Sequence, residues 1–104
     1  MYTVKFSMKA LERLLKIKKI DPAAIVECEK LLNDLKHKHF GIRLENKFNM
    51  DLSNCYKIYF YNRKYRLVYK KEGNVIKIVG AGERRDLKVY KDVFKEESWK
   101  ALFF

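Results

Sequence analysis

The spacing of apolar residues along the chain changes once, near Ile42, and this change restricts the fold more than any other feature of the sequence. Before Ile42, apolar side chains recur every three or four residues, which predicts amphipathic helices. After it, they alternate with polar side chains, which predicts strands. A chain of 104 residues has the size of one domain. We therefore expect one domain over residues 1–104, in which a helical half packs against a sheet.

The helical half is preceded by a short predicted strand, Tyr2–Phe6, in which apolar and polar residues alternate. Ser7 can cap a first helix that runs to about residue 19. The pair Asp21-Pro22 restarts a second helix, with Asp21 as its N-cap and proline in its first turn. We expect Gly41 to form the C-terminal cap of this second helix. Two helices joined by so tight a break predict a helical hairpin.

The second half contains three predicted strands and two turns. Residues 56–61 and 65–70 alternate about a turn at Asn62–Lys64, and Glu72–Asn74 forms the second turn. The third strand, Val75–Val79, is expected to end at Gly80-Ala81-Gly82.

The predicted fold class is α+β. We expect a mainly antiparallel four-stranded sheet packed against the N-terminal helical hairpin. A charged and aromatic segment at residues 87–102 is predicted to form a C-terminal helix, and a weak extra strand is possible near residues 47–52.

The net charge of +11 is concentrated in one part of the chain. Residues 36–71 carry ten basic and two acidic side chains, a net charge of +8, whereas residues 21–35 carry a net charge of −3. Charge polarised in this way is typical of a protein that binds nucleic acid. A basic surface that only aids solubility, or a partner with an acidic tail, would give the same pattern.

Several classes of protein are disfavoured by what the sequence contains. No apolar run is long enough for a transmembrane helix, and the first ten residues have no signal-peptide pattern, so we expect a cytoplasmic protein without membrane contact. Cys28 and Cys55 are too few for a disulfide framework and are expected to be reduced and buried. His37 and His39 lack a cysteine pair and are expected to be solvated or to face phosphate. We expect no metal and no cofactor.

One face of the predicted hairpin gathers side chains that could bind a phosphodiester. Strand alternation puts Lys57 and Tyr59 on the same side, and Arg66 can face them from the neighbouring strand. Ammonium and guanidinium groups bind phosphate, and a tyrosine ring can stack on a base. Such a set could cleave RNA by attack of the 2′-hydroxyl on the adjacent phosphorus. A solvated basic face, with tyrosines packed on lysine stems, fits the same residues.

The chain resembles the RelE/ParE toxin superfamily. The order of its predicted elements is similar over essentially the whole chain, and two segments carry similar motifs. The sequence Asn54–Phe60 followed by Tyr65–Tyr69 is similar to the central hairpin of that family, and Gly82–Arg85 with Val89-Tyr90 is similar to its Gly-x-Arg…Val-Tyr ending. The resemblance implies a small α+β toxin of a type II toxin–antitoxin module. The RelE branch cleaves mRNA in the ribosomal A site, whereas the ParE branch inhibits DNA gyrase and lacks the basic catalytic set.

The resemblance also implies roles for single residues. Lys57 and Arg66 would neutralise the scissile phosphate, Arg84 would stabilise the transition state, and Tyr90 would stack on or orient a nucleotide. A second lysine of the family pattern is replaced here by Tyr59, which implies a slower nuclease that Tyr59→Lys would accelerate. The remaining cations near this set are expected to contact RNA phosphates: Arg63, Lys64, Arg85 and Lys88.

The implied partners are an acidic cognate antitoxin and mRNA in the ribosomal A site, with operator DNA bound only through the antitoxin complex. We expect Arg66 and Arg84 to lie on an exposed face, so that alanine at either position leaves the fold intact. Three other interpretations stay open: a gyrase inhibitor, a catalytically weakened homologue that acts through protein binding, and a non-enzymatic DNA-binding protein.

Overall fold

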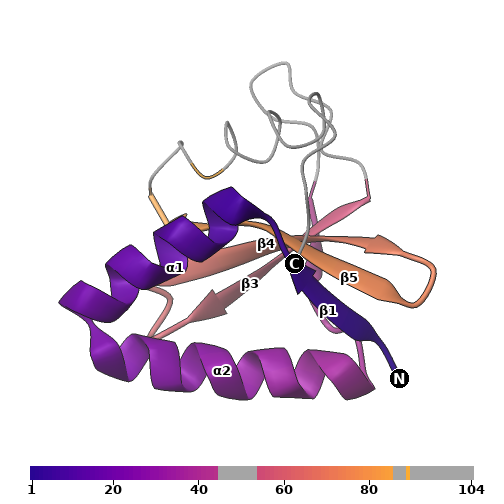
Figure 1. Ribbon diagram of the computed structural model, residues 1–104, viewed down its shortest axis with the longest axis horizontal. Helices are drawn as coiled ribbons and strands as arrows, with labels where there is room; N and C mark the ends of the chain where they lie inside the picture. Colours follow the sequence, from indigo (N-terminus) through magenta and orange to yellow (C-terminus); the bar gives the residue numbers. More distant parts are fainter. Residues whose placement is uncertain (45–53, 86–88, 90–104) are drawn as a thin grey trace.

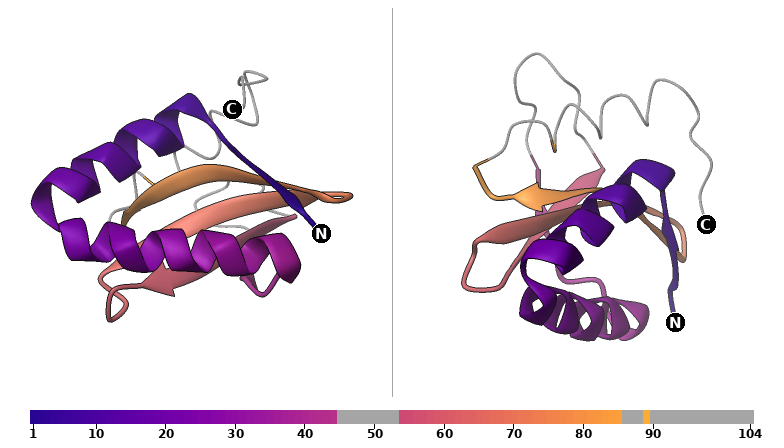
Figure 2. Two further views of the ribbon diagram at one scale, coloured as in Figure 1. Left: turned by 60° about the horizontal axis from the view of Figure 1, so that its bottom comes forward. Right: turned by 60° about the vertical axis from the view of Figure 1, so that its left-hand side comes forward.

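The computed structural model describes residues 1–44, 54–85 and 89. Two helices lie on one face of a five-stranded mixed sheet (Figures 1 and 2), which confirms the α+β class and the N-terminal helical hairpin. The elements follow one another as β1 (Thr3–Phe6), α1 (Met8–Ile20), α2 (Pro22–His37), β2 (Ile42–Arg43), β3 (Cys55–Phe60), β4 (Tyr65–Glu72) and β5 (Val75–Glu83).

The strands lie in the order β1-β5-β4-β3-β2. The run β3, β4 and β5 is antiparallel, as expected, but β1 pairs with β5 in parallel because the two helices carry the chain across the sheet before β2 begins. The predicted number of four strands is wrong, since β2 adds a two-residue edge strand beside β3. The predicted strand at residues 47–52 lies outside the described residues, as does the predicted C-terminal helix apart from Val89.

The two helices begin as predicted, but only one of them has the predicted side-chain cap. Ser7 is buried, and its Oγ accepts a hydrogen bond of 3.1 Å from the Ala10 N–H. Pro22 opens α2, whereas the Asp21 side chain makes no cap hydrogen bond. The Asp21 carboxylate instead accepts hydrogen bonds from Lys64 Nζ, at 2.8 Å, and from Tyr65 Oη. The junction of the helices is therefore tied to the β3–β4 hairpin.

Each face of the sheet carries its own cluster of buried side chains. The larger cluster lies between the sheet and the helices, and its members include Ala10, Ile17, Ala24, Cys28, Leu35, Ile58, Phe60, Leu67, Tyr69, Ile76 and Ile78. The smaller cluster lies on the opposite face and consists of Leu44, Cys55, Val68, Val79 and Val89. Both cysteines are free and buried, as predicted. No helix in the described part of the chain is long and apolar enough to cross a membrane.

Strand β5 does not end at the glycines, as the sequence predicted, but continues to Glu83. Gly82 pairs with Arg66 on β4. A Cβ atom at position 82 would lie only 2.7 Å from Cγ2 of Val89. The glycine therefore leaves room for Val89 to pack against the sheet, and it does not terminate the strand.

The segment from α2 to β2 is anchored by a buried tyrosine. Helix α2 ends at His37 with Lys38 as its C-cap, so the prediction that Gly41 caps it is wrong. The Gly41 N–H donates a hydrogen bond of 2.8 Å to Tyr69 Oη, and Oη lies 2.6 Å from Nδ1 of His39. His39 also packs edge-on against Tyr56. The half-buried His39 thus packs against other side chains, contrary to the expectation that it faces solvent or phosphate, whereas His37 is exposed as expected.

We expect Gly41→Ala to lower the free energy of unfolding by about 1–3 kcal/mol, the usual cost of overpacking. A Cβ at this position would lie 2.6 Å from Cε1 and Oη of Tyr69 and 2.9 Å from Cβ of Tyr56. Urea denaturation measures the change. Gly73→Asn is the control, because Gly73 has φ +58° and a Cβ there would meet no described atom within 4 Å apart from its chain neighbours, and asparagine tolerates this conformation. Equal stabilities of Gly41→Ala and the natural chain would contradict the described packing.

Candidate nucleic-acid interface

The sheet face opposite the helices carries three of the predicted site residues. On β3, Ile58 and Phe60 point into the core under the helices, so strand alternation directs Lys57 and Tyr59 to the other face. Tyr59 pairs directly with Arg66 on β4, and Arg66 pairs with Gly82 on β5. The structure therefore brings Lys57, Tyr59 and Arg66 together on one face, as the alternation predicted.

Arg66 does not lie on an exposed face. Only 4% of its surface is accessible. The expectation that Arg66 is exposed is therefore wrong. We now expect Arg66→Ala to lower the stability of the fold, because removing a buried guanidinium and its stem leaves a gap. Arg66 therefore offers little surface to a phosphate.

The Tyr59 ring lies between two cations. Lys57 Nζ is 5.2 Å from the ring centroid, and Cζ of Arg63 is 4.6 Å from it. A hydrogen bond from Lys57 is the largest cause that lowers the pKa of Tyr59 below its ordinary value of 10.0, and Arg63 lowers it further. Both groups favour the phenolate because each places positive charge near the oxygen. Tyr59 therefore loses its proton more easily than a free tyrosine.

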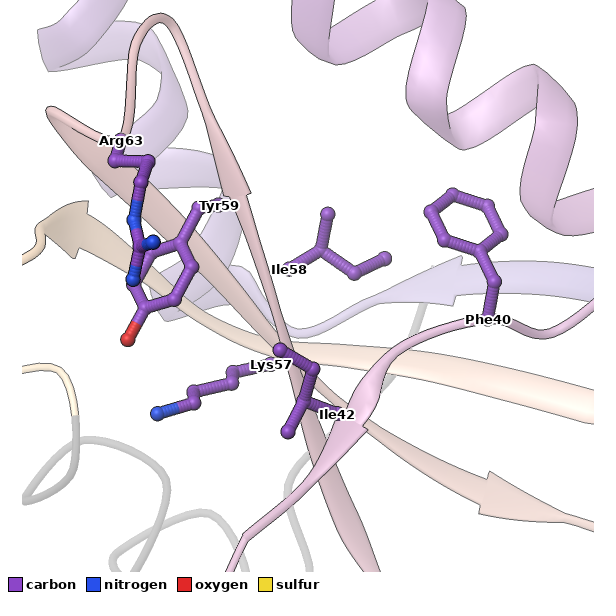
Figure 3. Close-up of a pocket in the computed structure, with 6 residues that line it drawn as sticks. All are labelled: Phe40, Ile42, Lys57, Ile58, Tyr59 and Arg63. Atoms are coloured by element: carbon purple, nitrogen blue, oxygen red, sulfur yellow. The ribbon is translucent and has the colours of Figure 1, made fainter.

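The β3–β4 turn holds Arg63 in this position. Tyr61, Asn62 and Arg63 all have positive φ angles, of 56°, 53° and 64°. This left-handed region is unfavourable for residues other than glycine, and consecutive examples store backbone strain. The turn directs the Arg63 side chain back over the Tyr59 ring, as Figure 3 shows.

A depression of about 350 Å³ lies along the outer edge of β3, and we call it the edge pocket. It is lined by Phe40, Ile42, Lys57, Ile58, Tyr59 and Arg63 (Figure 3). Sequence reasoning missed Phe40 and Ile42. The sequence signal that could have indicated them is a pair of bulky apolar residues inside the most basic part of the chain. In the structure both side chains are more than 40% exposed.

A second depression, of about 270 Å³, lies between the β3–β4 turn and the end of β5, and we call it the turn pocket. The Arg84 N–H donates a hydrogen bond of 2.9 Å to the carbonyl oxygen of Lys64, which holds the end of β5 against the turn. Arg63 lines both pockets. The lining residues are Asn62, Arg63, Lys64, Glu83, Arg84 and Arg85. The two pockets therefore form one cationic surface that extends from Lys57 to Arg85.

The other predicted contacts differ in their availability. The Lys64 ammonium forms an ion pair of 2.8 Å with Asp21. Their hydrogen bond raises the pKa of Lys64 and lowers that of Asp21. Lys64 therefore stabilises the junction between the hairpin and the helices, which was not predicted. Arg85 is exposed and lines the turn pocket. Lys88 and Tyr90 lie outside the described residues.

Among the described residues, no three His, Cys, Asp or Glu side chains come together in a way that could hold a metal ion. Burial raises the pKa of Cys28 to about 12, so its thiolate is scarcely populated at neutral pH. The side chains that line the cationic surface offer ammonium, guanidinium and phenol groups, together with the Glu83 carboxylate and the Asn62 amide.

No protein-family model, curated protein or solved structure matches the chain.

Proposed function

We propose that the protein is an RNA endonuclease, the toxin of a type II toxin–antitoxin system of RelE-like type, which cleaves mRNA at the ribosome. The observation that carries the proposal is the Tyr59 phenol, held between Lys57 and Arg63 on a cationic surface. A phosphodiester on this surface meets charges that bind it and a group that can accept a proton. The RelE-like hairpin and ending motifs, with Lys57 and Arg84 at matching positions, support the same function.

The proposed reaction needs no metal. Tyr59, as the phenolate, takes the proton of the 2′-hydroxyl, and the 2′-oxygen attacks the adjacent phosphorus. Lys57 neutralises a non-bridging oxygen, and Arg84 stabilises the charge that develops as the bond to the 5′-oxygen breaks. The leaving oxygen takes up a proton from solvent. The products are a 2′,3′-cyclic phosphate, which can open to a 3′-phosphate, and a 5′-hydroxyl.

Arg66 acts from beneath the surface in this proposal. Its charge lies directly across the β3–β4 ladder from Tyr59 and contributes positive potential on that face without touching the phosphate. Arg63 and Arg85 contact flanking phosphates as charged donors.

The proposed partners follow from the charge of the same surface. An acidic antitoxin that covers the surface between Lys57 and Arg85 blocks RNA access, and its own DNA-binding part links the complex to operator DNA. The ribosome presents mRNA in the A site.

The proposal is tested by adding the purified protein to ribosomes that hold an mRNA with an empty A site. We expect cleavage in the A-site codon, with 5′-hydroxyl and 2′,3′-cyclic phosphate or 3′-phosphate ends. Products with 5′-phosphate and 3′-hydroxyl ends would contradict the proposed attack by the 2′-hydroxyl. The same mRNA without ribosomes is the control for ribosome dependence.

A protein-binding role, as in a catalytically weakened homologue or a gyrase inhibitor, is the second candidate. It is favoured by the burial of Arg66 and by an apolar groove of about 220 Å³ between α1 and α2. Leu15, at one side of this groove, is 59% exposed. Inhibition of DNA supercoiling by purified gyrase, together with intact mRNA on ribosomes, would favour this second candidate.

A further inference from the structure

We propose that the edge pocket binds one unstacked nucleobase of the RNA, beside the phosphate that is cleaved. This inference rests on the proposed function, because it identifies a base-binding subsite next to the proposed Tyr59 reaction centre. It assigns a role to Phe40 and Ile42, which the proposed reaction does not use.

The lining of the edge pocket is divided in a way that suits a nucleotide. Phe40, Ile42 and Ile58 form an apolar side, and Lys57, Tyr59 and Arg63 form a polar, cationic side (Figure 3). A nucleobase has apolar faces and is attached to a charged phosphate, so it can place each part against a matching wall. The volume of about 350 Å³ is sufficient for one base with its sugar. Phe40 and Ile42 are 42% and 57% exposed, so their apolar surfaces are open to a ligand.

The cationic side also offers a flat surface for stacking. The Arg63 guanidinium lies 4.6 Å from the centroid of the Tyr59 ring, and the strained turn directs it there. Single-stranded RNA bases stack on aromatic rings and on guanidinium planes. Phe40 supplies a second aromatic ring on the other side of the same pocket. The edge pocket therefore has a planar group for base stacking at each of its two ends (Figure 3).

The edge of β3 supplies backbone groups that can recognise a base edge. Strand β2 pairs only with Tyr56 and Lys57, so in the described part of the chain β3 has no neighbouring strand on this side from Ile58 onward. The Cys55 carbonyl accepts a hydrogen bond from the Leu44 N–H. Because the direction of backbone groups alternates along a strand, the N–H and C=O of Tyr59 point to the same outer edge. They form a donor and acceptor pair beside the edge pocket.

Charge favours RNA over a protein strand as the occupant of this edge. Lys57 and Arg63 line the edge pocket, and Arg63 continues into the turn pocket with Arg84 and Arg85. The RNA backbone next to a base bound in the edge pocket can therefore follow a continuous row of cations. An extended peptide without acidic side chains would use the open edge and the apolar side, but it would leave the row of cations beyond them unused.

Phe40→Ala tests the proposal, and Val26→Ala is its matched control. Val26 is an apolar residue on α2 that is 68% exposed and lies outside both pockets. The binding probe is a short single-stranded RNA with 2-aminopurine at one position and 2′-O-methyl on every sugar, so that binding is measured without cleavage. We expect the 2-aminopurine fluorescence to be quenched at one position in complex with the natural chain. We expect Phe40→Ala to weaken binding by about 5- to 150-fold, the range for loss of base stacking on an aromatic side chain.

An abasic site at the quenched position separates base binding from other effects. The natural chain is expected to lose the same factor in affinity, whereas Phe40→Ala is expected to lose no more, since the contact is already absent. Equal binding by Phe40→Ala and Val26→Ala, or the absence of quenching at every position, would overturn the base pocket. So would a Phe40→Ala chain that binds RNA normally and loses affinity only for a co-encoded acidic protein.

The cleavage assay on ribosomes distinguishes failure of this proposal from failure of the proposed function. If Phe40→Ala cleaves mRNA with the same rate constant and the same affinity for the substrate as the natural chain, the base pocket is overturned and the nuclease function remains. Quenching that depends on Phe40, in a protein that leaves mRNA on ribosomes intact, supports the base pocket and overturns the nuclease function.

Discussion

Tyr59→Phe is expected to slow RNA cleavage on ribosomes by about 10²–10⁴-fold, the usual contribution of general acid–base catalysis. The substitution keeps the ring, so contacts of Arg63 and Lys57 with its face remain, and only the hydroxyl is lost. Single-turnover cleavage measures the effect. Tyr61→Phe, in the adjacent turn, is the control that removes a phenol hydroxyl without touching the proposed reaction centre. A Tyr59→Phe protein with an unchanged rate would show that the hydroxyl is not the base.

The same experiment has a pH signature. Because the phenolate is the active form, the cleavage rate of the natural chain is expected to rise with pH and to level off below the ordinary tyrosine pKa of 10.0, since Lys57 and Arg63 lower the pKa of Tyr59. Lys57→Gln removes the largest cause of that lowering and should move the plateau to higher pH. Tyr59→Phe should show no such rise. A flat profile for the natural chain would contradict the proposed role.

The cations around position 59 also explain why Tyr59→Lys is expected to raise the cleavage rate. A lysine there would lie beside Lys57 and Arg63, and neighbouring positive charge lowers the pKa of an ammonium group. A larger fraction of the neutral amine is then available as a base at neutral pH. We expect this variant to cleave faster than the natural chain in the same assay.

Arg84→Ala is expected to lower the cleavage rate by about 10²–10³-fold, which is the usual effect of losing one group that stabilises charge in a transition state. Its side chain lines the turn pocket, while its backbone N–H holds the end of β5 to Lys64. The alanine variant keeps that backbone hydrogen bond, so the free energy of unfolding should change by no more than about 0.5 kcal/mol. Single-turnover cleavage and urea denaturation measure the two quantities.

Lys30→Ala is the control for charge alone, because Lys30 is exposed on α2, away from the cationic surface. It removes one positive charge, as Arg84→Ala does, and is expected to leave the rate unchanged. Arg84→Lys should retain part of the activity, since it keeps the charge but loses the forked geometry. Full activity in a folded Arg84→Ala protein would exclude Arg84 from the site.

The sequence by itself determined the features that depend on near neighbours. The change of apolar spacing predicted the two helices and the three long strands, and Ser7 was correctly assigned as a cap. Alternation along β3 correctly put Lys57 and Tyr59 on one face, because the direction of a side chain in a strand is set by the backbone. These properties involve residues a few positions apart, so a local pattern contains them.

The tertiary structure decided what depends on segments that are distant in the chain. The Asp21 side chain could cap α2 or bind a cation elsewhere. It binds Lys64, 43 residues later in the chain, because the β3–β4 hairpin packs beside the junction of the two helices. The position of Arg66 on β4 is one that an exposed cation could occupy, yet the folded chain leaves only 4% of its surface accessible. Phe40 and Ile42 line the same pocket as Tyr59 because the segment that contains them pairs with β3 through β2. The spacing of apolar residues predicts the face of a helix or strand on which a residue lies. Only the packing of helices and strands against one another determines what covers that face.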